Sequence, residues 1–190
     1  MYNKDYKGDV CSHKHSFFLD NVFRRVIQNP KKIVGEYIKD GDTVIDLGCG
    51  PGYFSIDMAK MVGETGRVIS VDLQPEMLEK VEKKAEKQNL FRRITLHSCP
   101  QERIGLPLDV AADFVLVFYM LHETPHPDIF LQEVKTFLKK DGKCLIVEPL
   151  FHVSKKQFQK LTQDVKNIGF TILGRPSKKG GRSLLVSLGG

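Results

Sequence analysis

The stretch TVIDLGCGPGYFSIDMAKMVGETGRVISVD, residues 43–72, decides the fold class of this chain. Thr43 to Leu47 is a β-branched and apolar run, which is typical of a strand buried on both faces in a parallel sheet. Glycines follow at every second position, and an amphipathic run from Tyr53 to Met61 then has helical spacing. A second apolar run, Arg67 to Val71, predicts another strand. The stretch therefore predicts a strand, a glycine turn, a helix and a second strand.

The glycine turn and the acid after the second strand together predict a nucleoside site. Gly48, Gly50 and Gly52 let the backbone approach a ligand in conformations that a Cβ would forbid, and the first amides of the next helix point to the same space. Asp72 follows the second strand, twenty residues after Gly52. A carboxylate at that place can accept hydrogen bonds from the two hydroxyls of a ribose.

The glycine spacing differs from that of dinucleotide-binding proteins. Those sites need G-x-G-x-x-G or G-x-G-x-x-A, whereas the sixth position counted from Gly48 is Tyr53. The pattern present is D-x-G-x-G-x-G, beginning at Asp46. With Asp72 at its distance, it resembles motif I of the class I S-adenosylmethionine (SAM)-dependent methyltransferases. The alternative is a glycine turn that only joins a strand to a helix in another α/β fold.

The resemblance covers about residues 31–190 and implies an α/β, Rossmann-like three-layer sandwich. Its sheet has seven mostly parallel strands in the order 3-2-1-4-5-7-6, with the last strand antiparallel and helices on both faces. Residues 1–190 would form a single class I methyltransferase domain, in which the arm and helix of residues 1–30 cover the cofactor and substrate cleft. The strands expected from the sequence are 43–47, 67–71, 93–97, 112–119, 143–147, 170–173 and 183–188, and the helices are 16–28, 31–38, 53–61, 75–88, 128–138 and 154–168.

The resemblance also implies SAM as the cofactor and S-adenosylhomocysteine as the product. Gly48, Gly50 and Gly52 would pass under the methionine part of SAM, and Asp46 would lie near its ammonium group. Many family members carry an acid near the adenine amino group after the third strand, where this chain has Ser98 and Cys99. The expected cofactor-binding residues are Asp46, Gly48, Cys49, Gly50, Gly52, Asp72 on the ribose, Leu73 and Cys99 beside the adenine, and Phe118.

The end of the run ADFVLVFY, residues 112–119, resembles the family's motif IV position, where the substrate approaches the methyl group. We expect Tyr119, His122 and Glu123 to be the catalytic residues, with His126 and His152 as further candidates for substrate contact. A general base is needed only if the nucleophile carries a proton. The D/N-P-P-Y/F sequence of members that methylate adenine or glutamine is absent, so nucleic acid is not the expected acceptor.

Composition favours one ordinary globular domain. The chain has 190 residues, of which 41% are hydrophobic and 27% charged, and no apolar run has the length of a membrane span. The polar N-terminus does not resemble a signal peptide. Four widely spaced cysteines are typical of reduced thiols, so we expect a cytoplasmic protein, as a monomer or homodimer. Cys11, His13 and His15 alternate, but four ligands are needed for zinc, so no metal is expected.

The uneven charge and the bare domain leave three functions open. The formal charge is +6, and residues 151–190 hold eight Lys or Arg against Asp164, giving +7 there and −1 elsewhere. Our first hypothesis is a methyltransferase for a small-molecule acceptor, because the chain offers no appended domain to grip a macromolecule. The second is a methyltransferase for RNA or protein that docks through Lys178, Lys179 and Arg182. The third is a SAM-binding or nucleotide-binding module without catalysis.

Overall fold

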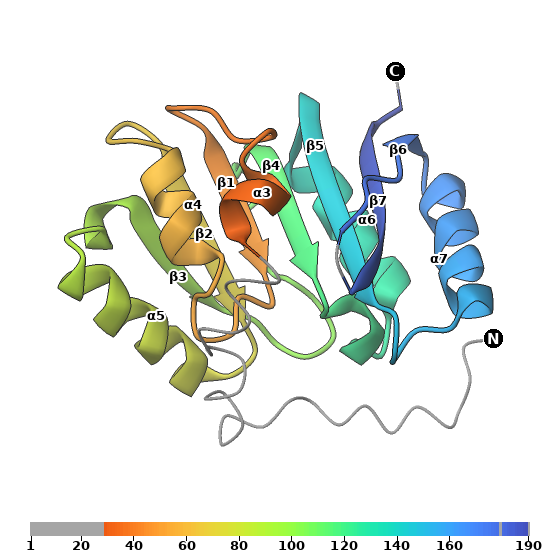
Figure 1. The fold of residues 1–190 in the computed structure, drawn as a ribbon, viewed down its shortest axis with the longest axis horizontal. Coiled ribbons are helices and arrows are strands. Elements are labelled where there is room, and N and C mark those ends of the chain that lie inside the picture. The colour runs from red at the N-terminus through yellow and green to blue at the C-terminus, as the bar shows by residue number, and fades with distance from the viewer. Residues whose placement is uncertain (1–28, 179, 190) are drawn as a thin grey trace.

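The described residues, 29–178 and 180–189 of a computed structural model, form one seven-stranded sheet (Figure 1). Its order is β3-β2-β1-β4-β5-β7-β6, in which β1 to β5 are parallel and β7 runs antiparallel to both of its neighbours. This confirms the predicted architecture. The strands are β1 Thr43–Leu47, β2 Arg67–Asp72, β3 Ile94–Ser98, β4 Ala112–Phe118, β5 Leu138–Pro149, β6 Phe170–Gly174 and β7 Gly181–Leu188.

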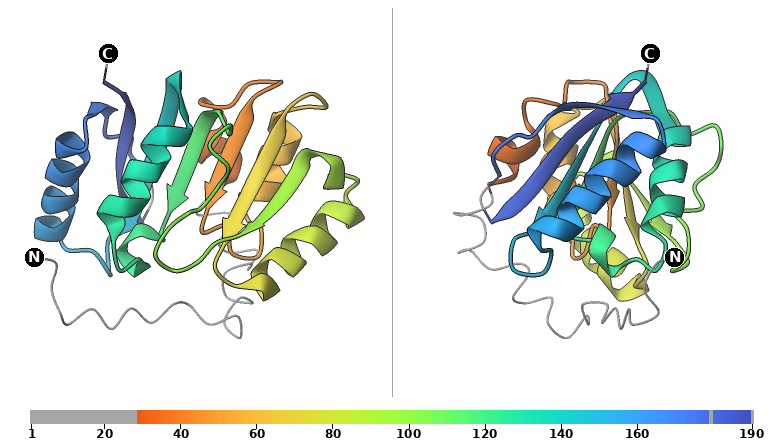
Figure 2. Two further views of the ribbon diagram at one scale, coloured as in Figure 1. Left: turned by 180° about the vertical axis from the view of Figure 1, so that it is seen from behind. Right: turned by 90° about the vertical axis from the view of Figure 1, so that its right-hand side faces the viewer.

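Helices cover both faces of the sheet, as Figures 1 and 2 show from opposite sides. Helices α3, α4 and α5 lie on one face, and α6 and α7 lie on the other. The α-helices are α3 Pro30–Val34, α4 Ser55–Met61, α5 Pro75–Lys87, α6 Pro127–Phe137 and α7 Lys155–Asn167, and short 3-10 turns are η2 Phe91–Arg93 and η3 Leu121–Glu123.

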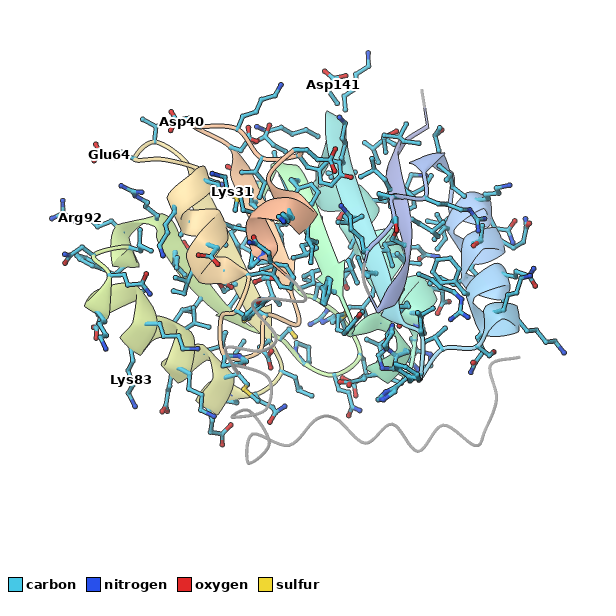
Figure 3. The ribbon with its side chains drawn as sticks, in the orientation of Figure 1. Lys31, Asp40, Glu64, Lys83, Arg92 and Asp141 are labelled. Atoms are coloured by element: carbon cyan, nitrogen blue, oxygen red, sulfur yellow. The ribbon has the colours of Figure 1, made fainter. Side chains whose placement is uncertain are left out.

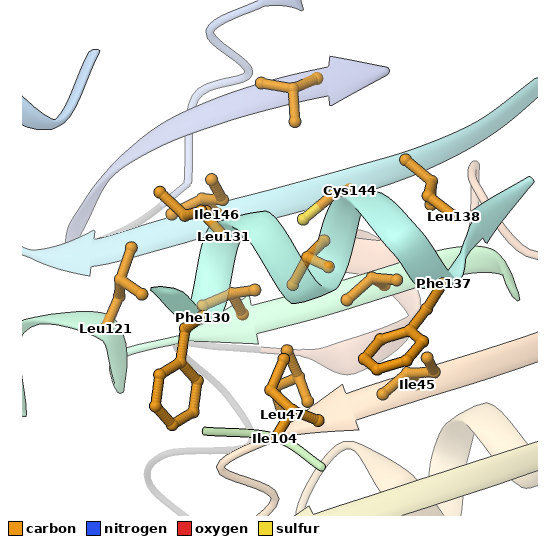
Figure 4. Close-up of a cluster of buried hydrophobic side chains, with 14 of the residues drawn as sticks. Ile45, Leu47, Ile104, Leu121, Phe130, Leu131, Phe137, Leu138, Cys144 and Ile146 are labelled. Carbon is orange, nitrogen blue, oxygen red and sulfur yellow. The ribbon is translucent and has the colours of Figure 1, made fainter. Parts of the chain in front are cut away.

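Two apolar layers hold the helices against the sheet because side chains alternate along each buried strand. On the α6 side, Ile45 and Leu47 of β1 pack with Phe130 and Leu131 of α6 (Figure 4). On the other side, Val44 packs with residues of α3 and α4. The same alternation directs the side chain of Asp46, two residues from Val44, toward the α4 face.

Charged side chains occupy the rim of the molecule, as Asp40, Glu64, Lys83 and Asp141 illustrate in Figure 3. Lys83 is exposed on the outer side of α5, whereas Met77, Leu78, Val81 and Ala85 of the same helix are buried. The charge run on this helix therefore belongs to a solvated face, as its spacing predicts.

Two boundaries differ most from the sequence prediction, and several others shift by one or two residues. Helix α3 ends at Val34 rather than Ile38. The predicted turn at residues 139–142 is instead an irregular part of β5, which starts at Leu138. Ala112 pairs with Leu138 and Phe114 with Lys143, so the register of β4 and β5 shifts between these pairs. Strand pairing on both sides of the polar segment thus overrides its local turn preference.

Several sequence predictions fall on residues 1–28, which lie outside the described residues. They are the helix 16–28, the arm over the cleft and the possible roles of Cys11, His13 and His15. These stay predictions, as does the single-domain assignment. Within residues 29–178 and 180–189, no helix combines the length and apolarity that crossing a membrane requires.

Candidate functional site

The parallel strands bring the predicted site residues to one edge of the sheet. Leu47 at the end of β1 pairs with Val71 of β2 and with Val117 of β4, so the loops after these three strands meet. A cavity of about 470 Å³ lies at this edge, where ligands of doubly wound sheets bind. It is lined by every site residue predicted for cofactor or catalysis except Gly52, namely Asp46, Gly48, Cys49, Gly50, Asp72, Leu73, Cys99, Phe118, Tyr119, His122 and Glu123.

The three glycines of the turn have different physical roles, although φ is positive at all three. A Cβ on Gly48 would lie 2.7 Å from Cβ of Met120, so the loops after β1 and β4 can approach only because this residue is glycine. A Cβ on Gly50 would meet no atom within 4 Å. On Gly52 it would lie 3.0 Å from Val81. Gly50 therefore leaves space open at the cavity wall, whereas Gly52 allows the turn to pack on α5.

Asp72 is held at the cavity by the backbone of two loops. Its Oδ2 accepts a 2.8 Å hydrogen bond from the Gly50 amide, and its Oδ1 accepts one of 2.9 Å from the Gln74 amide. Burial raises the pKa of the Asp72 carboxyl above its ordinary value, although hydrogen bonds from the amides of Gln74, Gly50 and Leu73 partly offset this effect. Each carboxylate oxygen has a second lone pair, which is the arrangement expected for recognition of ribose hydroxyls.

Asp46 is anchored from the first turn of α4. Ser55 Oγ donates a 2.5 Å hydrogen bond to Asp46 Oδ2, and both residues are buried. The pairing follows from the strand alternation that points Asp46 toward α4. It fixes an acid at the base of the cavity, in position to attract a cationic group of a ligand.

The cysteines at the cavity are protonated thiols rather than nucleophiles. Burial, with the charges of Asp46 and Asp72, raises the pKa of Cys49 well above its ordinary value. Burial and the charge of Asp72 raise the pKa of Cys99 to about 11. Because only the thiolate attacks, these side chains serve as small apolar walls.

The end of β4 carries a sharp backbone turn. Tyr119 has φ +58°, its amide donates to the Val147 carbonyl at 2.8 Å, and its ring stacks on that of Phe118 at 4.2 Å. A non-glycine residue in this region is uncommon and is found at turns and functional sites. The turn directs η3, with His122 and Glu123, to the cavity.

A buried acid that the sequence analysis did not assign to the site contacts His122. Glu148 Oε2 lies 2.6 Å from His122 Nδ1, and His122 Nε2 lies 4.0 Å from Glu123 Oε1. Burial lowers the pKa of His122, but the hydrogen bond and charge of Glu148, together with the charge of Glu123, outweigh it and leave the pKa raised. Glu148 ends the apolar run of the fifth strand, and an acid at a strand's carboxyl end is the signal that identifies it.

The remaining sequence candidates divide between the cavity and other places. His152 lines the cavity, and its ring lies edge-on to that of His122 at 5.6 Å. His126 is exposed and does not line it, and Ser98 does not line it either. Side chains that the sequence analysis did not select also line the cavity, among them Phe54, Gln74, Met77, Gln101 and Met120.

Two of the three cations proposed as a docking cluster for RNA are used inside the protein. Lys178 is buried, and its Nζ donates to the Ile33 carbonyl at 2.9 Å. Arg182 Nη1 donates to the Val153 carbonyl at 2.6 Å. Lys179 lies outside the described residues. Among the described residues of this cluster, Lys178 is therefore not part of an exposed phosphate-binding face, and one guanidinium nitrogen of Arg182 is bonded within the protein.

The residues present fit a nucleoside-containing ligand. Gly50 leaves open space beside Asp72, and this carboxylate is buried at the cavity wall with lone pairs still available. Asp46 supplies a second acid for a cationic group. Fold and site thus define a doubly wound α/β protein with a nucleoside-type cleft at the carboxyl edge of its sheet.

The chain belongs to a methyltransferase domain family, whose model matches residues 38–181. It is 38% identical over 112 residues to a demethylmenaquinone methyltransferase of Lactobacillus johnsonii, which covers 58% of this chain and 45% of that protein. A ubiquinone/menaquinone biosynthesis C-methyltransferase of Erwinia tasmaniensis is 25% identical over 169 residues, with 89% of this chain and 63% of that protein covered. The chain thus spans only about half to two thirds of the length of these curated relatives.

A solved structure has the same fold. A SAM-dependent methyltransferase from Aquifex aeolicus matches with a TM-score of 0.84 and 24% identity, over 94% of this chain and 100% of that chain. This likeness confirms the fold that the glycine turn and strand pattern predict.

Proposed function

We propose that this protein binds SAM and transfers its methyl group to a small-molecule acceptor. The observation that carries the proposal is the pairing of Gly50 with Asp72, which joins an open glycine turn to a ribose-type carboxylate in one cavity. Bound SAM supplies an electrophilic methyl group on a sulfonium sulfur. The protein's main task is then to hold the two reactants in line, which contributes roughly 7–11 kcal/mol to lowering the barrier.

The cofactor half of the proposal assigns a role to each side of the cavity. Asp72 would accept hydrogen bonds from the ribose hydroxyls, and Asp46, held by Ser55, would attract the ammonium group of the methionine part. Leu73 and Cys99 flank the adenine. Gly48 and Gly50 provide the backbone surface under the methionine part, and Cys49 and Phe118 complete the wall.

The acceptor half assigns Tyr119, His122 and Glu123 to the substrate. The cavity of about 470 Å³ falls within the roughly 300–1,000 Å³ of small-molecule sites, which supports a small-molecule ligand at this edge of the sheet. The names of the Lactobacillus and Erwinia relatives support a quinone-type ring as the first acceptor to test. A cytoplasmic location and a monomeric or homodimeric state stay predictions.

Two experiments test the proposal in sequence. Calorimetry with S-adenosylhomocysteine measures cofactor binding, and Asp72→Ala is the matched variant. Turnover is then followed as S-adenosylhomocysteine release from SAM with a panel of reduced naphthoquinones, phenols, thiols and amines. Absence of binding contradicts the cofactor assignment. Binding without turnover on any acceptor favours the non-catalytic module.

A further inference from the structure

Glu148 is an unusual residue to find in the interior of the sheet. It is 1% exposed and lies on the same face of β5 as Cys144 and Ile146, which are both fully buried. Its Oε2 contacts His122 at 2.6 Å, while its Oε1 is buried without a hydrogen-bond partner in the part of the chain that the structure describes. Burying a carboxylate is costly unless it is paired, so the contact with His122 is its main compensation.

No cationic side chain of β7 pairs with the Glu148 carboxylate in place of His122. Arg182 stands opposite Glu148 in the register of β5 and β7, but its guanidinium donates to the Val153 carbonyl at 2.6 Å. The other titratable groups facing His122 are Glu123 of η3, at 4.0 Å from Nε2, and His152 in the segment after β5. A carboxyl group therefore lies near each of the two ring nitrogens of His122, Glu148 near Nδ1 and Glu123 near Nε2.

The contact fixes where the proton of His122 lies. An ionised carboxylate can only accept hydrogen bonds, so the imidazole must donate from Nδ1. In the neutral imidazole, the lone pair is then on Nε2. His122 lines the cavity and its side chain is 19% exposed, so this nitrogen is the one available to a ligand.

We propose that Glu148 is a positioning residue that holds His122 as the Nδ1–H tautomer, so that Nε2 takes the proton of a methyl acceptor bearing an O–H or an acidic C–H group. The inference rests on the proposed function and narrows its acceptor class. An amine has a free electron pair in its neutral form and needs no such base, whereas a hydroxyl or carbon acid becomes strongly nucleophilic only after it loses a proton.

The proton transfer is balanced within the site. The acceptor's O–H or C–H bond breaks, its electron pair stays on the oxygen or carbon, and the proton forms a new N–H bond at Nε2. The resulting imidazolium is stabilised by Glu148 in the same way that a buried acid stabilises the base of a hydrolase triad. After reaction the proton leaves Nε2 for solvent, which restores the neutral imidazole.

The first test is nitrogen NMR of the histidine side chains in the protein without ligand, with the His122 signals assigned by their loss in His122→Gln. We expect neutral His122 to carry its proton on Nδ1. Glu148→Gln removes the charge and should lower the pKa of His122, and Glu148→Leu removes the acceptor and should release the tautomer. Glu123→Gln is the matched control, because it removes a nearby charge but leaves the Nδ1 contact intact.

The NMR spectra of the variants can either overturn or support the inference. A neutral His122 protonated on Nε2, or a tautomer unchanged in Glu148→Leu with a pKa unchanged in Glu148→Gln, overturns the inference. A retained Nδ1–H tautomer in Glu123→Gln, together with its loss in Glu148→Leu, supports it. Because these spectra need no cofactor, the result stands apart from the calorimetric test of SAM binding, whose failure would instead overturn the proposed function.

The second test uses the acceptor that gives turnover in the panel. His122→Gln should lower kcat about a hundred- to ten-thousandfold with little change in KM. The rate of the unaltered protein should fall as pH drops through the pKa of His122, and Glu148→Gln should move that inflection to lower pH. A purely structural Glu148 would leave the inflection where it is. Turnover confined to amines would overturn the acceptor class.

Discussion

The Gly50 amide donates a 2.8 Å hydrogen bond to Asp72 Oδ2, and this bond joins the glycine turn after β1 to the tip of β2. The Gln74 amide binds the other oxygen of the same carboxylate. One side chain thus shapes the turn and presents an acceptor to the cavity. If the same carboxylate binds a ribose as proposed, we expect folding and ligand binding to be coupled at this residue.

Replacing Asp72 should therefore affect both properties. Asp72→Ala removes the acceptor of the Gly50 and Gln74 amides, which should cost about 1–3 kcal/mol of unfolding free energy, and it should also weaken S-adenosylhomocysteine binding. Asp72→Asn keeps one acceptor oxygen and should have a smaller effect on both. Denaturant titration and calorimetry measure the two effects. An Asp72→Ala protein that binds as tightly as the unaltered one would rule out the ribose contact.

The same residue predicts how affinity depends on pH. Burial raises the pKa of Asp72 above 3.8 in the free protein, whereas hydroxyl donors of a ribose favour the charged form and should lower this pKa on binding. Binding then releases a proton, so affinity for S-adenosylhomocysteine should fall as pH drops through the raised pKa. Calorimetry over a pH series checks this. Asp72→Asn is the control, and an equal pH dependence in both proteins would contradict the assignment.

The glycines of the turn should separate folding from binding. Gly48→Ala places a methyl group 2.7 Å from Met120 Cβ at φ +66°, so it should destabilise the fold by roughly 1–3 kcal/mol. A methyl group on Gly50 meets nothing within 4 Å, so the cost of Gly50→Ala is confined to the left-handed backbone conformation, about 1–2 kcal/mol. The methyl group added in Gly50→Ala enters the space assigned to the cofactor, however, so the affinity for S-adenosylhomocysteine should fall.

Denaturant titration and calorimetry of both variants test this contrast. Gly174→Ala is the control for an added methyl group, because a Cβ there also meets nothing within 4 Å and the residue does not line the cavity, although its φ is not positive. Equal affinity in Gly50→Ala and Gly174→Ala would show that the open space at the turn is not the cofactor's.

Much of the fold follows from short stretches of sequence because local and tertiary preferences agree there. Thr43 to Leu47 is β-branched or apolar apart from Asp46, and the structure gives β1 the predicted bounds. Residues 139–142 show the opposite case. Their charged and glycine residues favour a turn, but pairing of Leu138 with Ala112 and of Lys143 with Phe114 keeps them inside β5.

The site was predictable where function depends on backbone and acid placement, and less so where it depends on distant contacts. The glycine spacing predicted residues of one side of the cavity, and the end of the fourth strand predicted Tyr119 and His122, which also line it. Glu148 is the exception, since its value lies in a contact with a residue 26 positions away in the chain. The two residues meet because β4 and β5 are neighbours in the sheet, so that the carboxyl ends of these strands lie side by side.

The position of Lys178 also depends on contacts that are distant in the sequence. In the sequence it is one of several cations in a glycine-rich loop, which favours a solvated position. In the structure its side chain is 6% exposed, its Nζ lies 3.5 Å from Glu36 Oε1 and donates to the Ile33 carbonyl of α3 at 2.9 Å. The lysine therefore ties the loop between β6 and β7 to α3.

Lys178→Met keeps most of the apolar stem but removes the donor. It should cost about 1–3 kcal/mol of unfolding free energy, because the Ile33 carbonyl loses its charged partner. Lys156→Met, an exposed position in the first turn of α7, is the control and should change stability by less than about 0.5 kcal/mol. Denaturant titration compares the two. Equal stability of both variants, with RNA binding in a low-salt gel shift lost in Lys178→Met but kept in Lys156→Met, would instead favour the docking hypothesis over the internal role.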